Sequence, residues 1–245
     1  MRIFIACFLL LITTSFPAAI SGGEPLSFLK LGGGVEGQAM GAYVAYVTDA
    51  TAAFWNPAAL LAIDSTELNI SYSLPFNSIL GNDSFLNYLN DIFVVNASYG
   101  MTVKKHDNSL TGYGFNILHV NSGEMQGYDL NAEELYTFSA KETAFSVSAA
   151  RYILPKLQSG LSVKAYTQDL SASSSFDAGF DIGLRYLVTD TFNLSFVAYD
   201  PFTIRSFTSA NRPFKIRTGI AFALSDAFSA SAQADYHYNK GIAFN

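Results

Sequence analysis

Apolar and polar residues alternate along most of the chain after residue 65. From Phe176 to Val188 every second position is apolar or aromatic, and the positions between carry Asp177, Gly179, Asp181, Gly183 and Arg185. A period of two is that of a β-strand with one apolar and one polar face. The pattern recurs at 214–224 and 228–238, with weaker copies at 66–74, 93–103, 110–120, 142–153, 160–170 and 191–200. We therefore predict an all-β fold of about nine strands.

The length of these segments favours strands that cross a membrane. Most run for ten residues or more, whereas strands of soluble proteins average ~5–6 residues and tilted membrane-spanning strands need ~9–11. Aromatic residues lie near the segment ends, as in the interfacial girdles of outer-membrane barrels. The alternative is a soluble β-sandwich with one wetted face. We predict a transmembrane antiparallel β-barrel of the outer-membrane type.

The polar face of the predicted strands would then line the barrel lumen. Opposite charges on this face would stabilise the barrel by cross-strand pairing, and they would alternatively set solute selectivity. Arg151 is in line with the apolar face, and a bulge at Ala149–Ala150 would return it to the lumen. The predicted lumen-lining residues are Lys164, Asp177, Asp181, Arg185, Lys215, Arg217, Asp235 and His237.

The connections predict how the strands are oriented. Short connections fall at 153–160, 187–192 and 223–228, and long ones at 75–91, 121–141 and 201–212. Outer-membrane barrels keep long loops outside and close with an even strand number. A ninth strand would end on the long-loop side, so either 42–47 hides a strand or the barrel is incomplete at the C-terminus. We expect an incomplete barrel, with residues 239–245 starting an external loop.

Composition and the first residues predict export. Charged residues make up only 14% of the chain and the net charge is −6, which argues against a nucleic-acid partner. Arg2, an apolar run over 3–12 and small residues near 19–21 predict a signal peptide over residues 1–21. The only cysteine, Cys7, lies in it. We expect a mature protein without thiols in the lipid of the cell outer membrane.

Residues 22–65 precede the predicted barrel, which covers 66–245. Asp49 is positioned to cap a short helix over 50–55, and Asn56 to cap a second one with Pro57 at its first helical position. These helices are apolar all round, so they are stable only when buried, and the lumen is the available place. They would form either a cap under the barrel or a hatch that obstructs the pore.

Motifs for cofactors, metals and catalysis lack their required context. The glycine-rich run 32–37 is not followed by the helix and parallel strands of a dinucleotide site. Asp235 and His237 share one strand face, but residues two apart on a strand are ~6.5–7 Å apart, too far for direct general-base contact. A barrel-embedded hydrolase using His237 is a weak alternative. We expect no cofactor, no metal and no catalytic residue.

Residues 28–62 resemble the N-terminal signature of the PorV/PorQ family, which is related to FadL-like long-chain fatty-acid transporters. The matching segments are Phe28–Gly32, Met40–Gly41, Ala42–Ala45, Asp49–Ala50 and Trp55–Leu60. Three features depart from the family pattern: the usual arginine before the Met-Gly pair is missing, with Glu36 and Gln38 nearby, one glycine of the usual pair is missing, and Ala59 replaces a glycine. The resemblance implies a barrel with a hatch motif at Trp55, Asn56, Pro57 and Ala58.

The resemblance also implies two functions. One is passage of hydrophobic or amphipathic solutes across the outer membrane. The other is a non-transport role as a partner of type IX protein secretion. The first would make hydrophobic small molecules the ligands, and the second would make secretion-system proteins the partners.

Overall fold

The computed structural model describes residues 26–40, 43–73, 93–104, 109–128, 134–170, 173–201, 205–206, 214–225, 228–237 and 241–244. The predicted signal peptide lies outside the described residues. The described residues begin with four short helices: η1 (Ser27–Leu31), α2 (Val35–Met40), α3 (Ala52–Trp55) and η2 (Pro57–Ala62). None of the helices in these ranges is long and apolar enough to cross a membrane.

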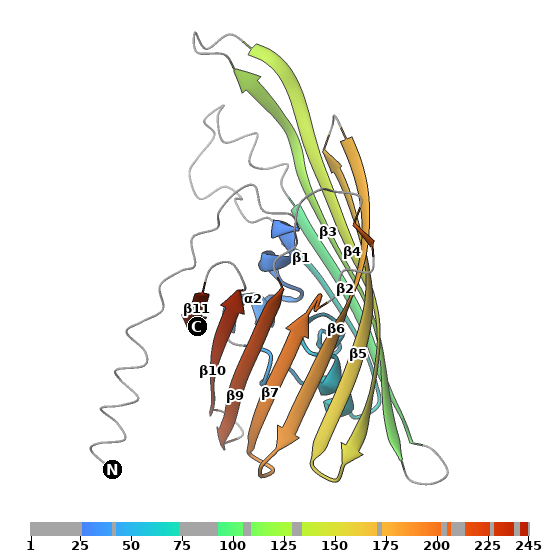
Figure 1. Cartoon of the computed structure of the whole chain (residues 1–245), viewed down its shortest axis with the longest axis vertical. Helices are drawn as coiled ribbons and strands as arrows, with labels where there is room; N and C mark the ends of the chain where they lie inside the picture. Colours follow the sequence, from blue (N-terminus) through green and yellow to red (C-terminus); the bar gives the residue numbers. More distant parts are fainter. Residues whose placement is uncertain are drawn as a thin grey trace, which may run out of the picture.

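Within the part of the chain that the structure describes, one antiparallel sheet of eleven strands follows the helices, and neighbouring strands are mostly consecutive in the chain. Figure 1 shows it as a tall curved wall with the short helices on its inner side. Within the described residues, β1 pairs with β2 alone and β11 with β10 alone. The strands are β1 (Thr66–Ser73), β2 (Phe93–Lys104), β3 (Leu110–Tyr128), β4 (Glu134–Leu154), β5 (Leu157–Leu170), β6 (Ser173–Leu187), β7 (Phe192–Tyr199), β8 (Arg205–Ser206), β9 (Lys215–Ser225), β10 (Phe228–His237) and β11 (Gly241–Phe244).

All nine strands predicted from the alternation are confirmed, and they span eight to 21 residues. β8 and β11 have two and four residues, too few for a period of two to be recognised. β11 overturns the expectation of an external loop over 239–245, because residues 241–244 turn back and pair with β10. The possible strand at 42–47 is also wrong: residues 43–47 form a turn, in which the backbone N–H groups of Tyr46 and Val47 both donate to the Tyr43 carbonyl.

The expected long connection at 121–141 is mostly strand. β3 continues to Tyr128 and β4 begins at Glu134, with a register irregularity between Asn121 and Glu124. Apolar and polar residues do not alternate strictly over this stretch. Backbone hydrogen bonds pair the two strands of a hairpin without a continuous apolar face, so strict alternation is not required. Figure 1 shows this β3–β4 hairpin rising above the other strands.

The two faces of the sheet differ in exposure as the alternation predicts, with the apolar face outward and the polar face inward. The even-numbered residues from Gln158 to Gln168 of β5 and the odd-numbered residues from Asp177 to Arg185 of β6 face the helices and are buried. The apolar residues between them are exposed or half-buried. Val163 is 54% exposed and Val147 63%. Arg151 faces outward, because β4 stays in regular register through Ala149–Ala150 and the irregularity lies between Tyr152 and Leu154. The predicted bulge at 149–150 is therefore wrong.

We predict that Val163→Lys lowers the free energy of folding into a bilayer by about 2–4 kcal/mol, because a lysine near the midplane must leave water. Denaturant titration of the protein in liposomes, followed by heat-modifiable gel migration, measures the change. Asp190→Lys, in the exposed turn between β6 and β7, is the control and should change stability by less than about 0.5 kcal/mol. Equal stability of the two variants would argue against an outer surface that faces lipid.

Candidate functional site

The candidate site is the contact between the N-terminal segment, residues 26–63, and the inward face of the sheet. The predicted motif lies at its centre: Trp55 is 5% exposed, and Asn56 and Ala58 are fully buried. Pro57 is buried with them at the start of η2. The motif therefore packs in the interior, where each of its polar groups needs a partner.

Both polar atoms of the Asn56 side chain form hydrogen bonds. Its Oδ1 accepts from the backbone N–H of Ala58 at 3.1 Å, which confirms the predicted cap, and its Nδ2 donates to the carbonyl of Val44 at 2.9 Å. Pro57 is the first residue of η2, where no backbone N–H is needed. The cap predicted at Asp49 is displaced: α3 begins at Ala52, and Asp49 accepts from the backbone N–H of Thr51 at 3.0 Å.

Two adjacent rows of small residues let the helices lie close to the strands. A Cβ on Gly160 would overlap the backbone of Pro57 and Ala58, so only glycine allows this approach. Register pairing aligns the small residues across neighbouring strands. The row that meets η2 comprises Gly112, Ala150, Gly160 and Gly183, and the row beside α3 comprises Gly100, Gly114, Ser148 and Ser162.

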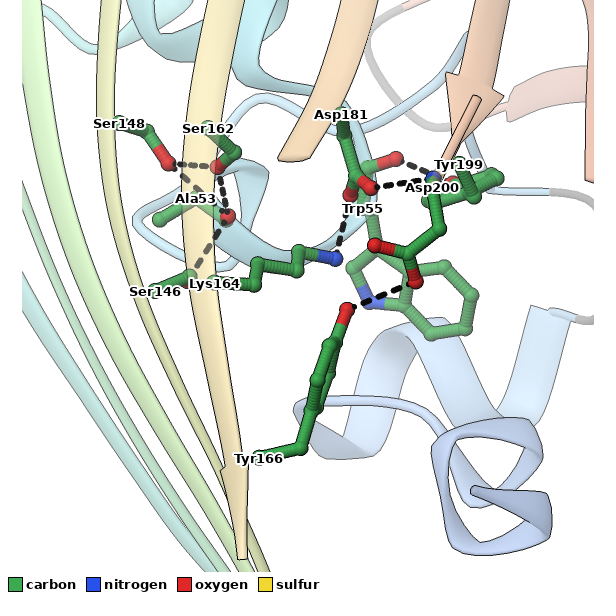
Figure 2. A network of polar contacts seen from close by, with 10 residues as sticks. All are labelled: Ala53, Trp55, Ser146, Ser148, Ser162, Lys164, Tyr166, Asp181, Tyr199 and Asp200. Carbon is green, nitrogen blue, oxygen red and sulfur yellow. Dashed lines mark hydrogen bonds and ion pairs between the residues drawn. The ribbon is translucent and has the colours of Figure 1, made fainter. Parts of the chain in front are cut away.

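Hydrogen bonds from the sheet satisfy the last carbonyls of α3 (Figure 2). The Ala53 carbonyl accepts from the hydroxyls of Ser146, Ser148 and Ser162 at 3.2–3.3 Å. The Tyr199 hydroxyl donates to the Trp55 carbonyl at 2.5 Å. A four-residue helix leaves these carbonyls without intrahelical partners, so the sheet supplies the donors.

A buried ion pair lies next to these contacts (Figure 2). Lys164 of β5 pairs with Asp181 of β6, and the two side chains are 5% and 0% exposed. The Asp181 carboxylate also accepts from the backbone N–H of Asp200 at 3.1 Å. The Asp200 carboxylate accepts from the Tyr166 hydroxyl at 2.9 Å. Lys164 Nζ lies 5.2 Å from the centre of the Phe54 ring, so the pair contacts α3 directly.

A second charged group lies across β9 and β10. Asp235 binds Lys215 at 2.9 Å and Arg217 at 3.0 Å, and Gln233 donates to it at 2.7 Å. The Arg217 guanidinium lies 5.4 Å from the centres of both the Trp55 and Tyr199 rings. Cations over aromatic faces are attracted by the ring quadrupole. This group therefore holds the indole of Trp55 against the sheet.

The three remaining predicted lumen residues, Asp177, Arg185 and His237, lie on β6 and β10. Asp177 is buried in β6, opposite Tyr166 in the register. Arg185 is also buried in β6, closer to the β6–β7 turn. His237 is the last residue of β10 and pairs with Lys215 in register, and its side chain lies outside what the structure describes.

The chemistry of the described groups is that of packing and charge pairing. Among the described residues, no three His, Cys, Asp or Glu side chains gather in a way that would hold a metal ion. Outside the strands, burial and then the nearby Asp49 carboxylate raise the pKa of the Tyr43 hydroxyl far above its usual range. Tyr43 thus stays a neutral donor, and its hydroxyl donates to Glu36 at 3.4 Å.

The fold is shared with solved structures of a toluene transporter and of a FadL homologue. The toluene transporter TbuX of Ralstonia pickettii aligns with a TM-score of 0.58 at 15% identity, covering 86% of this chain and 73% of TbuX. A FadL homologue from Pseudomonas aeruginosa aligns with a TM-score of 0.51 at 13% identity, covering 84% of this chain and 68% of the homologue. No protein-family model and no curated protein matches the chain in sequence.

These likenesses define the class of fold. The chain has the fold of a transmembrane antiparallel β-barrel of the outer-membrane type, in the FadL-like form with short helices at its N-terminus. TbuX is a toluene transporter, and the expectation that the present protein is not an enzyme stays a prediction.

The pattern of apolar and polar residues does not reveal several residues of the site. The three serines and Tyr199 that bind α3 sit in ordinary alternating positions, with nothing in the pattern to distinguish them. The inward glycines Gly160 and Gly183 could have been recognised in the sequence, because glycine inside a strand often marks the close approach of another backbone. Their alignment across the sheet depends on the register, which the sequence pattern leaves undetermined.

We predict that Gly160→Ala displaces η2 and exposes Trp55, because the added methyl would overlap the Pro57–Ala58 backbone. Trp55 is the only tryptophan of the chain, so a red shift of intrinsic fluorescence reports the displacement. Ser159→Thr adds a methyl at the neighbouring outward position and should leave the spectrum unchanged. An unshifted Gly160→Ala spectrum would contradict the tight contact.

The ion pair between Lys164 and Asp181 generates a second prediction. Lys164→Met leaves a buried carboxylate without its cation and should cost about 3–5 kcal/mol of folding free energy. The double variant Lys164→Met, Asp181→Leu removes both charges and should recover most of that loss. Denaturant titration monitored by Trp55 fluorescence measures both. A double variant as unstable as the single one would mean that the pair is not the source of the loss.

Proposed function

We propose that the protein passes hydrophobic or amphipathic solutes across the cell outer membrane. The observation that carries this proposal is the arrangement of the sheet, which has an apolar outer face and a polar inner face covered by the N-terminal segment. The same fold occurs in a toluene transporter. On this proposal residues 66–245 form the wall, with Lys164, Asp177, Asp181, Arg185, Lys215, Arg217, Asp235 and His237 along the lumen.

In this proposal residues 22–65 are a hatch, with Trp55, Asn56, Pro57 and Ala58 as its contact motif. The buried contacts of Ala53, Trp55 and Val44 with the sheet hold the segment inside its curve, where it obstructs the lumen. Opening requires these few hydrogen bonds to break or the segment to shift. A hatch fits this position better than a cap beneath the barrel, because the contacts reach the middle of β5 and β6.

The PorV/PorQ assignment is the finer part of the proposal. It is supported by the motif over residues 28–62, whose Trp-Asn-Pro-Ala core forms the buried contact described above. We favour solute passage over a role in type IX secretion, since the transporter fold favours the first and no described contact favours the second.

An engineered disulfide between hatch and wall tests whether solutes pass by hatch movement. An ideal Cβ on Gly100 lies 3.5 Å from the Cβ of Ala50, within the ~3.5–4.5 Å range of disulfides. In the way is Ile63 Cδ1, the end of a flexible side chain. The variant is therefore Ala50→Cys, Gly100→Cys in the full chain, with Gly100→Cys alone as the matched control.

We predict that cells or proteoliposomes with the double-cysteine variant take up labelled toluene after reduction and lose most of this uptake after oxidation. The single-cysteine control should be insensitive to the redox state. Uptake that is equal in both states would overturn the moving hatch. A wild-type chain that takes up neither toluene nor a labelled medium-chain alcohol faster than empty liposomes would overturn solute passage itself.

A further inference from the structure

Three buried polar side chains form a row on the inner face between the hatch motif and the β6–β7 turn. Gln158 pairs with Arg185 across β5 and β6, and Arg185 pairs with Ser195 across β6 and β7. All three face inward and are 2%, 7% and 6% exposed, respectively. Directly opposed side chains have Cβ atoms about 4.5–5.5 Å apart, so their polar ends converge.

Each member of this row has a buried polar atom without a partner. Gln158 Oε1, Arg185 Nε and Ser195 Oγ make no hydrogen bond within the described part of the chain. Folded proteins leave few such atoms, because each costs free energy comparable to a lost hydrogen bond. Three of them in adjacent residues indicate a site built for a further group.

The charge of Arg185 defines the kind of group. The other inward cations Lys164, Lys215 and Arg217 each have a carboxylate partner, whereas Arg185 has none among the described residues. A buried cation without a counter-charge is costly. The guanidinium fork matches the two oxygens of a carboxylate or phosphate, and the Ser195 hydroxyl adds a donor.

Gln158 can complete the donor set. Its Nε2 lies 2.8 Å from the Tyr152 hydroxyl. A half-turn of the amide lets its carbonyl accept from that hydroxyl and turns its NH₂ toward Arg185. The row then presents a cation and two neutral donors to one small volume.

The hatch borders this row. The next inward residue along β5 from Gln158 is Gly160, and the next inward residue along β6 from Arg185 is Gly183. Both glycines lie against Pro57 and Ala58, and Gly183 also lies against Asn56. In the same row as Arg185, Gly219 lies against Val44 and Ala45 of the N-terminal segment. The residues on both sides of the Asn56–Val44 hydrogen bond therefore lie next to this row.

We propose that Arg185, Gln158 and Ser195 form a binding site for the oxyanion group, carboxylate or phosphate, of an amphipathic solute. The site lies on the short-turn side of the hatch motif, where a solute that has passed the motif is held. This inference rests on the proposed function for the nature of the solute, and the residues that define the site are independent of it.

Equilibrium dialysis of labelled benzoate and benzamide against the full chain in nanodiscs tests the site, with empty nanodiscs as background. The two probes have the same shape, and only benzoate carries an oxyanion. We expect wild-type protein to bind benzoate about tenfold or more tightly than benzamide, and Arg185→Gln to abolish this preference. Arg185→Lys should retain part of it, because the charge stays and the fork is lost.

Ser195→Asp is a second variant, which places a carboxylate opposite Arg185 and fills the site from within. It should remove the benzoate preference, whereas the neutral Ser195→Asn should keep most of it. If heat-modifiable gel migration shows that Arg185→Gln does not fold, the comparison of Ser195→Asp with Ser195→Asn tests the site instead. Equal binding of benzoate and benzamide to wild type, or a preference that survives Ser195→Asp, would overturn the site.

Inorganic phosphate as competitor separates the two sources of oxyanion. Displacement of benzoate supports recognition of the oxyanion alone, and its absence supports a carboxylate on an apolar body. The outcome of this binding experiment is independent of the outcome of the uptake experiment. If the protein shows no uptake but still prefers benzoate, solute passage is overturned and the oxyanion site stands. If it shows uptake but no preference for benzoate, the oxyanion site is overturned and solute passage stands.

Discussion

The close approach between the η2 backbone and strands β5 and β6 is the contact on which the rest of the interior depends. Gly160 and Gly183 carry no side chain at the point where Pro57 and Ala58 cross them. This lets the preceding turn of chain place the Ala53 and Trp55 carbonyls within reach of the sheet hydroxyls. A larger residue at either glycine would lift α3 and η2 together and leave those carbonyls without donors.

The buried charges are arranged around the same contact. Asp181 is held by Lys164 and Asp235 by Lys215 and Arg217, so each carboxylate meets its cation within the sheet while the cation touches an aromatic residue of the N-terminal segment or of β7. Such pairs contribute little net stability but strongly disfavour arrangements that separate them. They therefore make one position of the N-terminal segment much better than its neighbours, which packing of apolar side chains alone would not do.

The sequence pattern predicts some parts of this structure and not others. Alternation in β6 and β9 identifies strand, length and inward face together, because one face of each is buried and the period is two throughout. The Asn56-Pro57 start of η2 follows from capping chemistry, which is local. Arg151 and β11 are predicted wrongly because a bulge depends on the neighbouring strand and four residues are too few to show a period.

The contacts that form the site depend on register, which is not local. Ser146, Ser148 and Ser162 converge on one carbonyl only because β4 and β5 pair as they do. Likewise Gln158, Arg185 and Ser195 are 27 and ten residues apart along the chain and meet only across three strands. Alternation shows that each residue faces inward, but it does not show which inward residues are opposite one another.

The β3–β4 hairpin has a consequence for how the molecule meets its surroundings. β4 has 21 residues, whereas a tilted strand needs only ~9–11 to cross the hydrocarbon layer. In the orientation proposed above, about half of β4 stands clear of the lipid on the cell exterior, well beyond the tops of β7 and β9. Among the described residues, the part of the protein that reaches farthest from the lipid, and that an antibody or a phage would meet, is then this two-stranded hairpin (Figure 1).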